Sequence, residues 1–137
     1  MKSVIEACFV GAILICAAGG QESQKTALTK GISVRMPVAS HAVEMRAADE
    51  PNVTVVAIAA DGKVFVGIKA TEPDALSNLS EGTVYVKADS RVVYQKVLTV
   101  LDALRGKSVV LLSAPPENAA KSQGIVPPWG MRLIVPR

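Results

Sequence analysis

The pattern of hydrophobic and polar residues is clearest in the second half of the chain, where the period of a strand gives way to that of a helix. Val84, Val86 and Ala88 alternate with Tyr85 and Lys87. A two-residue period places alternate side chains on opposite faces of a sheet. This segment therefore predicts a strand with one buried face, and with Tyr85 and Lys87 pointing outward.

An amphipathic helix is predicted directly after this strand. Its apolar residues recur at the spacing of one helical face, and they are Val93, Val97, Val100, Leu101 and Leu104. Asp89 or Ser90 is the expected N-cap, because a short polar side chain can accept a hydrogen bond from the free N–H groups of the first helical turn. Gly106 can end the helix, since glycine tolerates the left-handed conformation.

The remaining pattern predicts five more strands and a second, short helix. The strands cover residues 32–36, 53–60, 63–67, 108–113 and 131–135. Asp61 and Gly62 are expected to form a two-residue hairpin turn. The short helix covers residues 72–77, with Thr71 as its cap and Pro73 in its first turn. Together these elements predict an α+β domain with a small mixed sheet and two helices.

The first twenty residues are strongly apolar and predict either a single transmembrane helix or a signal peptide. A helix over residues 4–20 would be about 25 Å long, against a hydrocarbon core of about 30 Å. Lys2 and the small residues at 17–20 also fit a cleaved signal peptide. Either way, residues 1–20 anchor or target the chain, 21–31 form a linker, 32–113 form the domain and 114–137 form a C-terminal extension.

Composition limits the kinds of partner that the chain could have. Of its 137 residues, 50% are hydrophobic and 20% are charged, which is too apolar for a disordered chain. The net charge is +3, but the basic residues are spread along the chain and only 4% of the residues are aromatic. Nucleic-acid-binding domains usually concentrate basic residues on one face, so we expect no nucleic-acid partner.

No spacing of residues predicts a catalytic or metal site. His41 is the only histidine, and the two cysteines, Cys8 and Cys16, both lie in the apolar N-terminal run. Metal and catalytic sites need several partners at a fixed spacing. We therefore expect no enzyme activity, no cofactor and no metal, and interpret the cysteines as small apolar residues.

The predicted strand and helix resemble the ExbD/TolR family, inner-membrane proteins with one anchor and a small periplasmic domain. The resemblance lies in a strand that ends in Ala88 and Asp89, in Tyr94, in a helix that ends near Gly106, and in a final apolar strand. The upstream sequences ISVRMPVAS and VTVVAIAADGKVFV are also similar to family segments. The resemblance covers roughly residues 31–113.

This resemblance implies a single-pass protein of the bacterial inner membrane with its C-terminal domain in the periplasm. Glu6, in the sequence VIEACFVGAILI, stands where the family carries a proton-coupling aspartate. A carboxylate buried in a membrane is driven toward its neutral form and can titrate when water reaches it. The alternative interpretations place Glu6 in the head-group region or in a signal peptide.

The resemblance also implies a function and partners. The chain would be a subunit of a proton-driven motor that energises transport or envelope maintenance. Its partners would be an ExbB/TolQ-like membrane protein, a TonB/TolA-like energy transducer, a second copy in a homodimer, and peptidoglycan. The alternative is an exported, soluble periplasmic binding domain of the same fold without motor function, from which residues 1–20 are removed.

Overall fold

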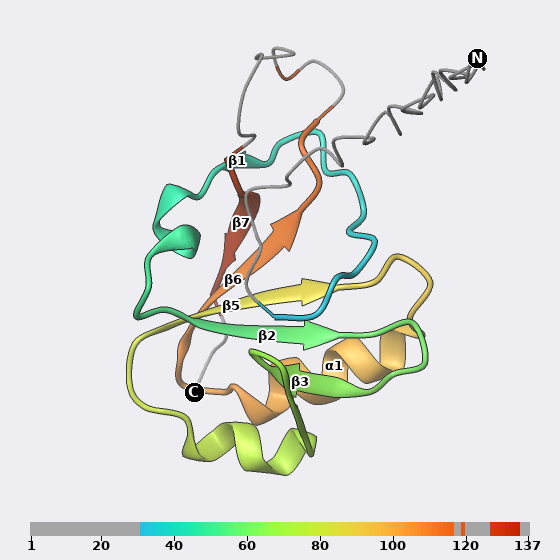
Figure 1. Cartoon of the computed structure of the whole chain (residues 1–137), viewed down its shortest axis with the longest axis vertical. Coiled ribbons are helices and arrows are strands. Elements are labelled where there is room, and N and C mark those ends of the chain that lie inside the picture. Colours follow the sequence, from blue (N-terminus) through green and yellow to red (C-terminus); the bar gives the residue numbers. More distant parts are fainter. Residues whose placement is uncertain (1–30, 117–118, 120–126, 135–137) are drawn as a thin grey trace, which may run out of the picture.

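A computed structural model describes residues 31–116, 119 and 127–134 (Figure 1). These residues form seven strands: β1 (Val43–Glu44), β2 (Thr54–Ile58), β3 (Val64–Val66), β4 (Lys69–Thr71), β5 (Thr83–Ala88), β6 (Ser108–Ser113) and β7 (Trp129–Leu133). They also form the α-helix α1 (Tyr94–Ala103) and two short 3-10 helices, η1 (Arg46–Asp49) and η2 (Pro73–Asn78). Residues 1–20 and Glu6, with the predicted anchor, lie outside the described residues.

All seven strands belong to one mixed sheet in the order β1-β7-β6-β5-β2-β3-β4. The three central strands β6, β5 and β2 are parallel, and the pairs on either side of them are antiparallel. The predicted α+β class with a mixed sheet is confirmed, but the sheet is larger than the small sheet expected. None of the helices within the described ranges is long and apolar enough to cross a bilayer.

Strand β5 lies at the centre of the sheet and is buried on both faces. Its side chains from Val84 to Ala88 are all buried, including Tyr85 at 6% and Lys87 at 3% exposure. The prediction that Tyr85 and Lys87 point outward to solvent is therefore wrong. The two-residue period identified the strand correctly, but it could not reveal that the outer face would also be covered.

A separate hydrophobic core lies on each face of the sheet. On the α1 side, Val86 and Val56 pack with Leu76 of η2 and Leu104 after α1. On the opposite side, Tyr85 belongs to a smaller cluster that also contains the following residues: Val55, Val110, Leu112, Ala48 of η1 and the half-buried Met36. Figure 1 shows the corresponding layers, with α1 behind the sheet and the chain after residue 31 crossing in front of it.

Helix α1 begins later than the sequence predicts. Its N-cap is Val93, which makes no side-chain capping bond, so the prediction of Asp89 or Ser90 as the cap is wrong. Residues 89–92 instead form a turn, in which the N–H of Val92 donates to the carbonyl of Asp89 at 3.0 Å. Val93 consequently leaves the buried stripe and is 68% exposed, while Val92 packs against the core in its place.

The hairpin after β2 and the start of the short helix differ from the prediction in detail. Ala59 and Lys63 close a three-residue hairpin loop through the N–H of Ala59 and the carbonyl of Lys63, 2.9 Å apart, with Gly62 at a φ of 84°. The predicted short helix is present as η2, and Pro73 lies in its first turn as expected. Its N-cap is Glu72 rather than Thr71.

The two ends of the described chain also differ from the prediction. Residues 32–36, predicted to be a strand, form no strand of the sheet. Strand β6 has the predicted bounds, whereas β7 begins two residues before the predicted 131–135 and pairs with β6. Because β7 is part of the sheet, residues 129–133 belong to the domain rather than to an extension after residue 113.

The core on the α1 side predicts a large cost for shortening Leu104, which is fully buried. Leu104→Ala should lower the free energy of unfolding by about 2–5 kcal/mol, because it removes buried methyl groups and leaves a cavity. Leu98→Ala is the matched control, since Leu98 lies on α1, which Leu104 directly follows, but is 39% exposed. Urea unfolding of the purified full-length chain measures both, and equal losses would contradict this description of the core.

Candidate functional site

The most highly organised polar group in the described structure is the carboxylate of Asp89. Asp89 directly follows β5 at the carboxyl end of the parallel strands, and its N–H extends the sheet by donating to the carbonyl of Ile58 at 2.9 Å. The residue is only 4% exposed. A carboxylate taken out of water at such a position requires hydrogen-bond donors.

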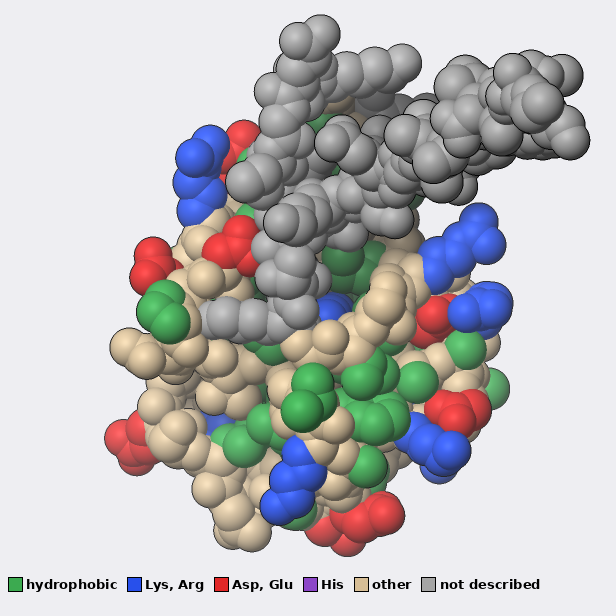
Figure 2. Space-filling model, in the orientation of Figure 1, with side chains coloured by type: hydrophobic (Ala, Val, Ile, Leu, Met, Phe, Trp, Pro, Cys, Tyr) green, Lys and Arg blue, Asp and Glu red, His purple; other side chains and the backbone are tan. Residues whose placement is uncertain are grey.

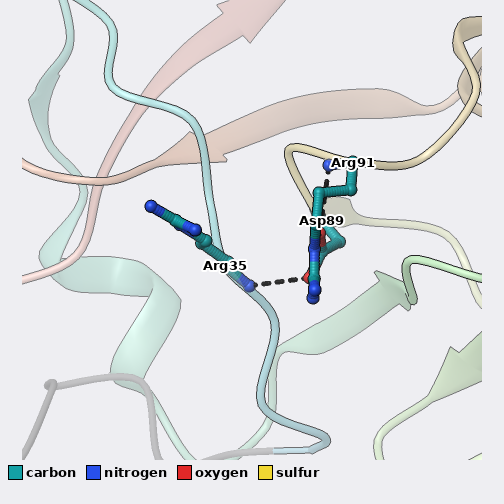
Figure 3. Close-up of polar contacts among 3 residues, drawn as sticks. All are labelled: Arg35, Asp89 and Arg91. Atoms are coloured by element: carbon teal, nitrogen blue, oxygen red, sulfur yellow. Dashed lines mark hydrogen bonds and ion pairs between the residues drawn. The ribbon is translucent and has the colours of Figure 1, made fainter.

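Four N–H groups from two segments supply these bonds (Figure 3). The guanidinium of Arg91 is bidentate, with Nε 2.9 Å from Oδ1 and Nη2 3.1 Å from Oδ2. The backbone N–H of Arg91 donates to Oδ1 at 3.0 Å, and that of Arg35 donates to Oδ2 at 3.1 Å. Figure 3 shows that the side chain of Arg35 points away, so Arg35 contributes only its backbone.

These bonds keep the carboxyl group of Asp89 ionised. The Arg91 guanidinium, followed by the backbone N–H groups of Arg35 and Arg91, holds the pKa of the Asp89 carboxyl far below its usual range. Each bond favours the ionised form, because the donors interact with the carboxylate more strongly than with the neutral acid. Asp89 is therefore ionised near neutral pH, where it is unsuited to carry protons or to act as a general base.

Through Arg35, Asp89 holds the segment of residues 31–38, which we call the strap. The N–H of Ser90 donates to the carbonyl of Arg35 at 2.7 Å, and the N–H of Ala114 donates to that of Pro37 at 2.9 Å. Val38 and Ala114 also form an isolated parallel bridge. The strap is thereby joined to the ends of both β5 and β6, two adjacent strands at the centre of the sheet.

The strap begins at a close contact between two backbone segments. Gly31 has a φ of 77°, and a Cβ at this position would lie 2.6 Å from the carbonyl oxygen of Gly67. Farther along, Met36 packs against the core cluster that contains Tyr85. Main-chain bonds and apolar packing therefore both fix the strap to the sheet.

Lys87 lies on β5 between Tyr85 and Asp89, on the sheet face that the strap covers. Its burial lowers the pKa of its amine, since a charged ammonium is less favourable away from water. Two ionisable residues of β5 and its end, Lys87 and Asp89, are thus buried on this face. The burial of both side chains depends on how closely the strap covers that face.

The site residues predicted from the sequence have different outcomes. Glu6 lies outside the described residues. Asp89 is important, but as the acceptor that holds the strap rather than as a helix cap, and Ser90 contributes its N–H rather than its hydroxyl. His41 is exposed. Within the described ranges, no group of histidine, cysteine, aspartate and glutamate side chains could hold a metal ion.

The partners of Asp89 were missed from the sequence for two different reasons. Arg91 follows Asp89 by two residues, and this spacing of opposite charges could have suggested a local ion pair. Arg35 is 54 residues away and donates from its backbone, so its side-chain type carries no signal.

The chain matches no protein-family model and no curated protein. The resemblance to ExbD/TolR proteins consequently rests on the motifs of residues 31–113.

The ion pair of Asp89 predicts a specific loss of stability in acid. Because its folded-state pKa lies below the ordinary value of 3.8, its contribution is complete above that value and decreases as the pH falls below it. Asp89→Asn should therefore lower the melting temperature by several degrees at pH 7 and flatten the acid side of the stability profile. Melting temperatures of both proteins, measured from pH 2 to pH 7 in steps of about one pH unit, would test this prediction.

The control for this experiment is Asp102→Asn. Asp102 also pairs with an arginine, Arg105, at 2.6 Å, but its side chain is 69% exposed. An exposed ion pair contributes at most about 1 kcal/mol, so this variant should keep nearly the full stability at pH 7. Arg91 is 66% exposed, so the two ion pairs differ mainly in the burial of the carboxylate, and equal behaviour of both variants would show that this burial does not matter.

The contact at the start of the strap predicts a position-specific effect of adding a methyl group. Gly31→Ala should destabilise the protein by more than the roughly 1–2 kcal/mol that a left-handed backbone costs an alanine, because the methyl group also meets a backbone carbonyl. Gly67→Ala is the control, since Gly67 has a φ of 62° but open space around its Cβ position. Denaturant unfolding compares them, and a smaller loss for Gly31→Ala would show that the strap is not seated there.

Proposed function

We propose that this chain is an ExbD/TolR-like subunit of a proton-driven motor in the bacterial inner membrane. In this proposal, residues 4–20 anchor the chain, Glu6 carries the proton and the α+β domain lies in the periplasm. An ExbB/TolQ-like membrane protein would work with the anchor in the motor, and a TonB/TolA-like protein would be energised by it. The domain itself would act by binding and force transfer rather than by catalysis.

The motifs that resemble the family support the proposal in part. The strand that ends in Ala88 and Asp89, followed by Tyr94 on a helix, occurs here in a mixed sheet with a helix packed on one face. This arrangement is compatible with the small periplasmic domain that the resemblance implies. A fold alone does not specify a function, so the coupling between anchor and domain carries more weight.

The observation that carries the proposal is the attachment of the strap. The chain that follows the predicted anchor and linker enters the domain as the strap, which is bonded to Asp89, Ser90 and Ala114 at the ends of β5 and β6. A displacement of the chain before residue 31 would therefore act directly on the central strands. A subunit that turns a movement in the membrane into a movement of a periplasmic domain needs a firm attachment at the domain end, and the strap supplies one.

The decisive experiment replaces the proposed proton carrier in the native host. Glu6→Gln should abolish the energised process, because an amide cannot take up or release a proton in this pH range, whereas Glu6→Asp should retain a measurable part of it. Cell fractionation and the intact mass of each variant are measured in parallel. Both variants should remain in the inner membrane with residues 1–20 attached.

Other outcomes would overturn the proposal. If the mature protein were soluble and began near residue 21, the chain would be the alternative predicted above, an exported periplasmic binding domain. If Glu6→Gln stayed in the membrane and retained full activity, the anchor would be real but Glu6 would not carry the proton.

A further inference from the structure

A second feature lies at the opposite end of the parallel strands from Asp89. A pocket of about 480 Å³ opens where β5 and β6 begin, between the loop after η2 and the loop after α1. This volume is within the range of small-molecule sites. Nothing in the motor proposal uses this end of the sheet, so the pocket requires its own interpretation.

The pocket wall carries two cations at its α1 side. Lys107 lines it, and its Nζ donates a hydrogen bond to the carbonyl of Leu79 at 2.6 Å. This bond fixes the position of the half-buried lysine and uses one of the three ammonium donors. Arg105 lines the same wall, and one of its guanidinium nitrogens, Nη2, donates to Asp102 at 2.6 Å. A guanidinium group has five N–H donors.

Hydroxyl groups and one carboxylate complete the chemistry of the wall. Thr83 and Ser108 are direct neighbours in the pairing of β5 with β6, and both line the pocket. Glu81 also lines the pocket, so the ionised side chains of the lining sum to +1, and to zero when Asp102, the partner of Arg105, is included. Neighbouring hydroxyl and cationic donors at a concave, solvent-accessible position suit an oxyanion, since charge-assisted bonds to oxygen are the strongest available there.

We infer that this pocket binds the carboxylate or phosphate group of a small molecule. Lys107 and Arg105 would bind the charged oxygens, and the hydroxyls of Thr83 and Ser108 would donate to them. Glu81 would weaken the affinity by repulsion. The same chemistry would also recognise the phosphate of a lipid head group, and the experiment below distinguishes the two sources.

The experiment titrates the purified full-length chain with inorganic phosphate and, separately, with citrate. Sodium chloride is adjusted to keep the ionic strength constant, because simple screening would otherwise alter surface ion pairs. We expect saturable chemical-shift changes that are confined to the pocket, where β5 and β6 begin. Vesicles that contain anionic phospholipid are tested in parallel as the alternative source of phosphate.

Removing a cation and removing the carboxylate of the pocket should change the ligand affinity in opposite directions. Arg105→Gln and Lys107→Gln should each weaken binding about tenfold, which is the effect of losing one charge-assisted hydrogen bond. Glu81→Gln should strengthen binding, on the order of threefold, by removing a like charge. Lys69→Gln is the control, because it removes an exposed cation from the edge strand β4, outside the pocket.

Lys107→Gln also removes the bond to Leu79, so its effect is considered only if the variant keeps the native spectrum. Arg105→Gln and Glu81→Gln do not depend on that bond and keep the test decisive. Three results would overturn the inference: no saturable binding of phosphate or citrate, an equal loss in Lys69→Gln, or binding to anionic vesicles alone. None of these results depends on whether Glu6 carries protons.

Discussion

The ionised carboxylate of Asp89 is the constraint on which the arrangement of the chain depends. A carboxylate that is only 4% exposed requires donors in place of water, and it obtains four N–H groups. Three of these belong to Arg91, but the fourth comes from the strap, which is remote in sequence. The strap and the end of β5 therefore stabilise each other, because each supplies polar groups that the other needs.

The same interaction explains how a central strand of this domain can be buried on both faces. One face of the sheet is covered by α1 and η2, whereas on the other face the described residues that pack against the sheet come from η1 and the strap. Among the described residues, the apolar cluster on that second face is the smaller of the two, and main-chain bonds to Ser90 and Ala114 add to its packing. The Figure 2 view shows hydrophobic side chains gathered over β2 and β3, with charged side chains mainly around the rim.

The two ends of the parallel strands consequently have different properties. At the carboxyl end, Asp89 has its hydrogen bonds satisfied within the protein and serves to connect segments. At the amino end, the cations Arg105 and Lys107 border an open pocket and keep donors for a ligand. A domain that transmits force needs the first property, and a domain that responds to a small anion needs the second. The structure is compatible with both in one sheet.

The sequence by itself determined the elements whose pattern is local. The bounds of β6, the hairpin after β2, Pro73 in the short helix and most of the buried stripe of α1 follow from spacing and turn chemistry among neighbouring residues. Only the tertiary structure decided that Tyr85 and Lys87 are buried and that residues 32–36 lie in the strap instead of forming a strand. It also decided that Asp89 binds the strap rather than capping α1. The physical reason is that burial on a second face and a backbone bond over 54 residues depend on which segments meet in space, and side-chain periodicity does not encode that information.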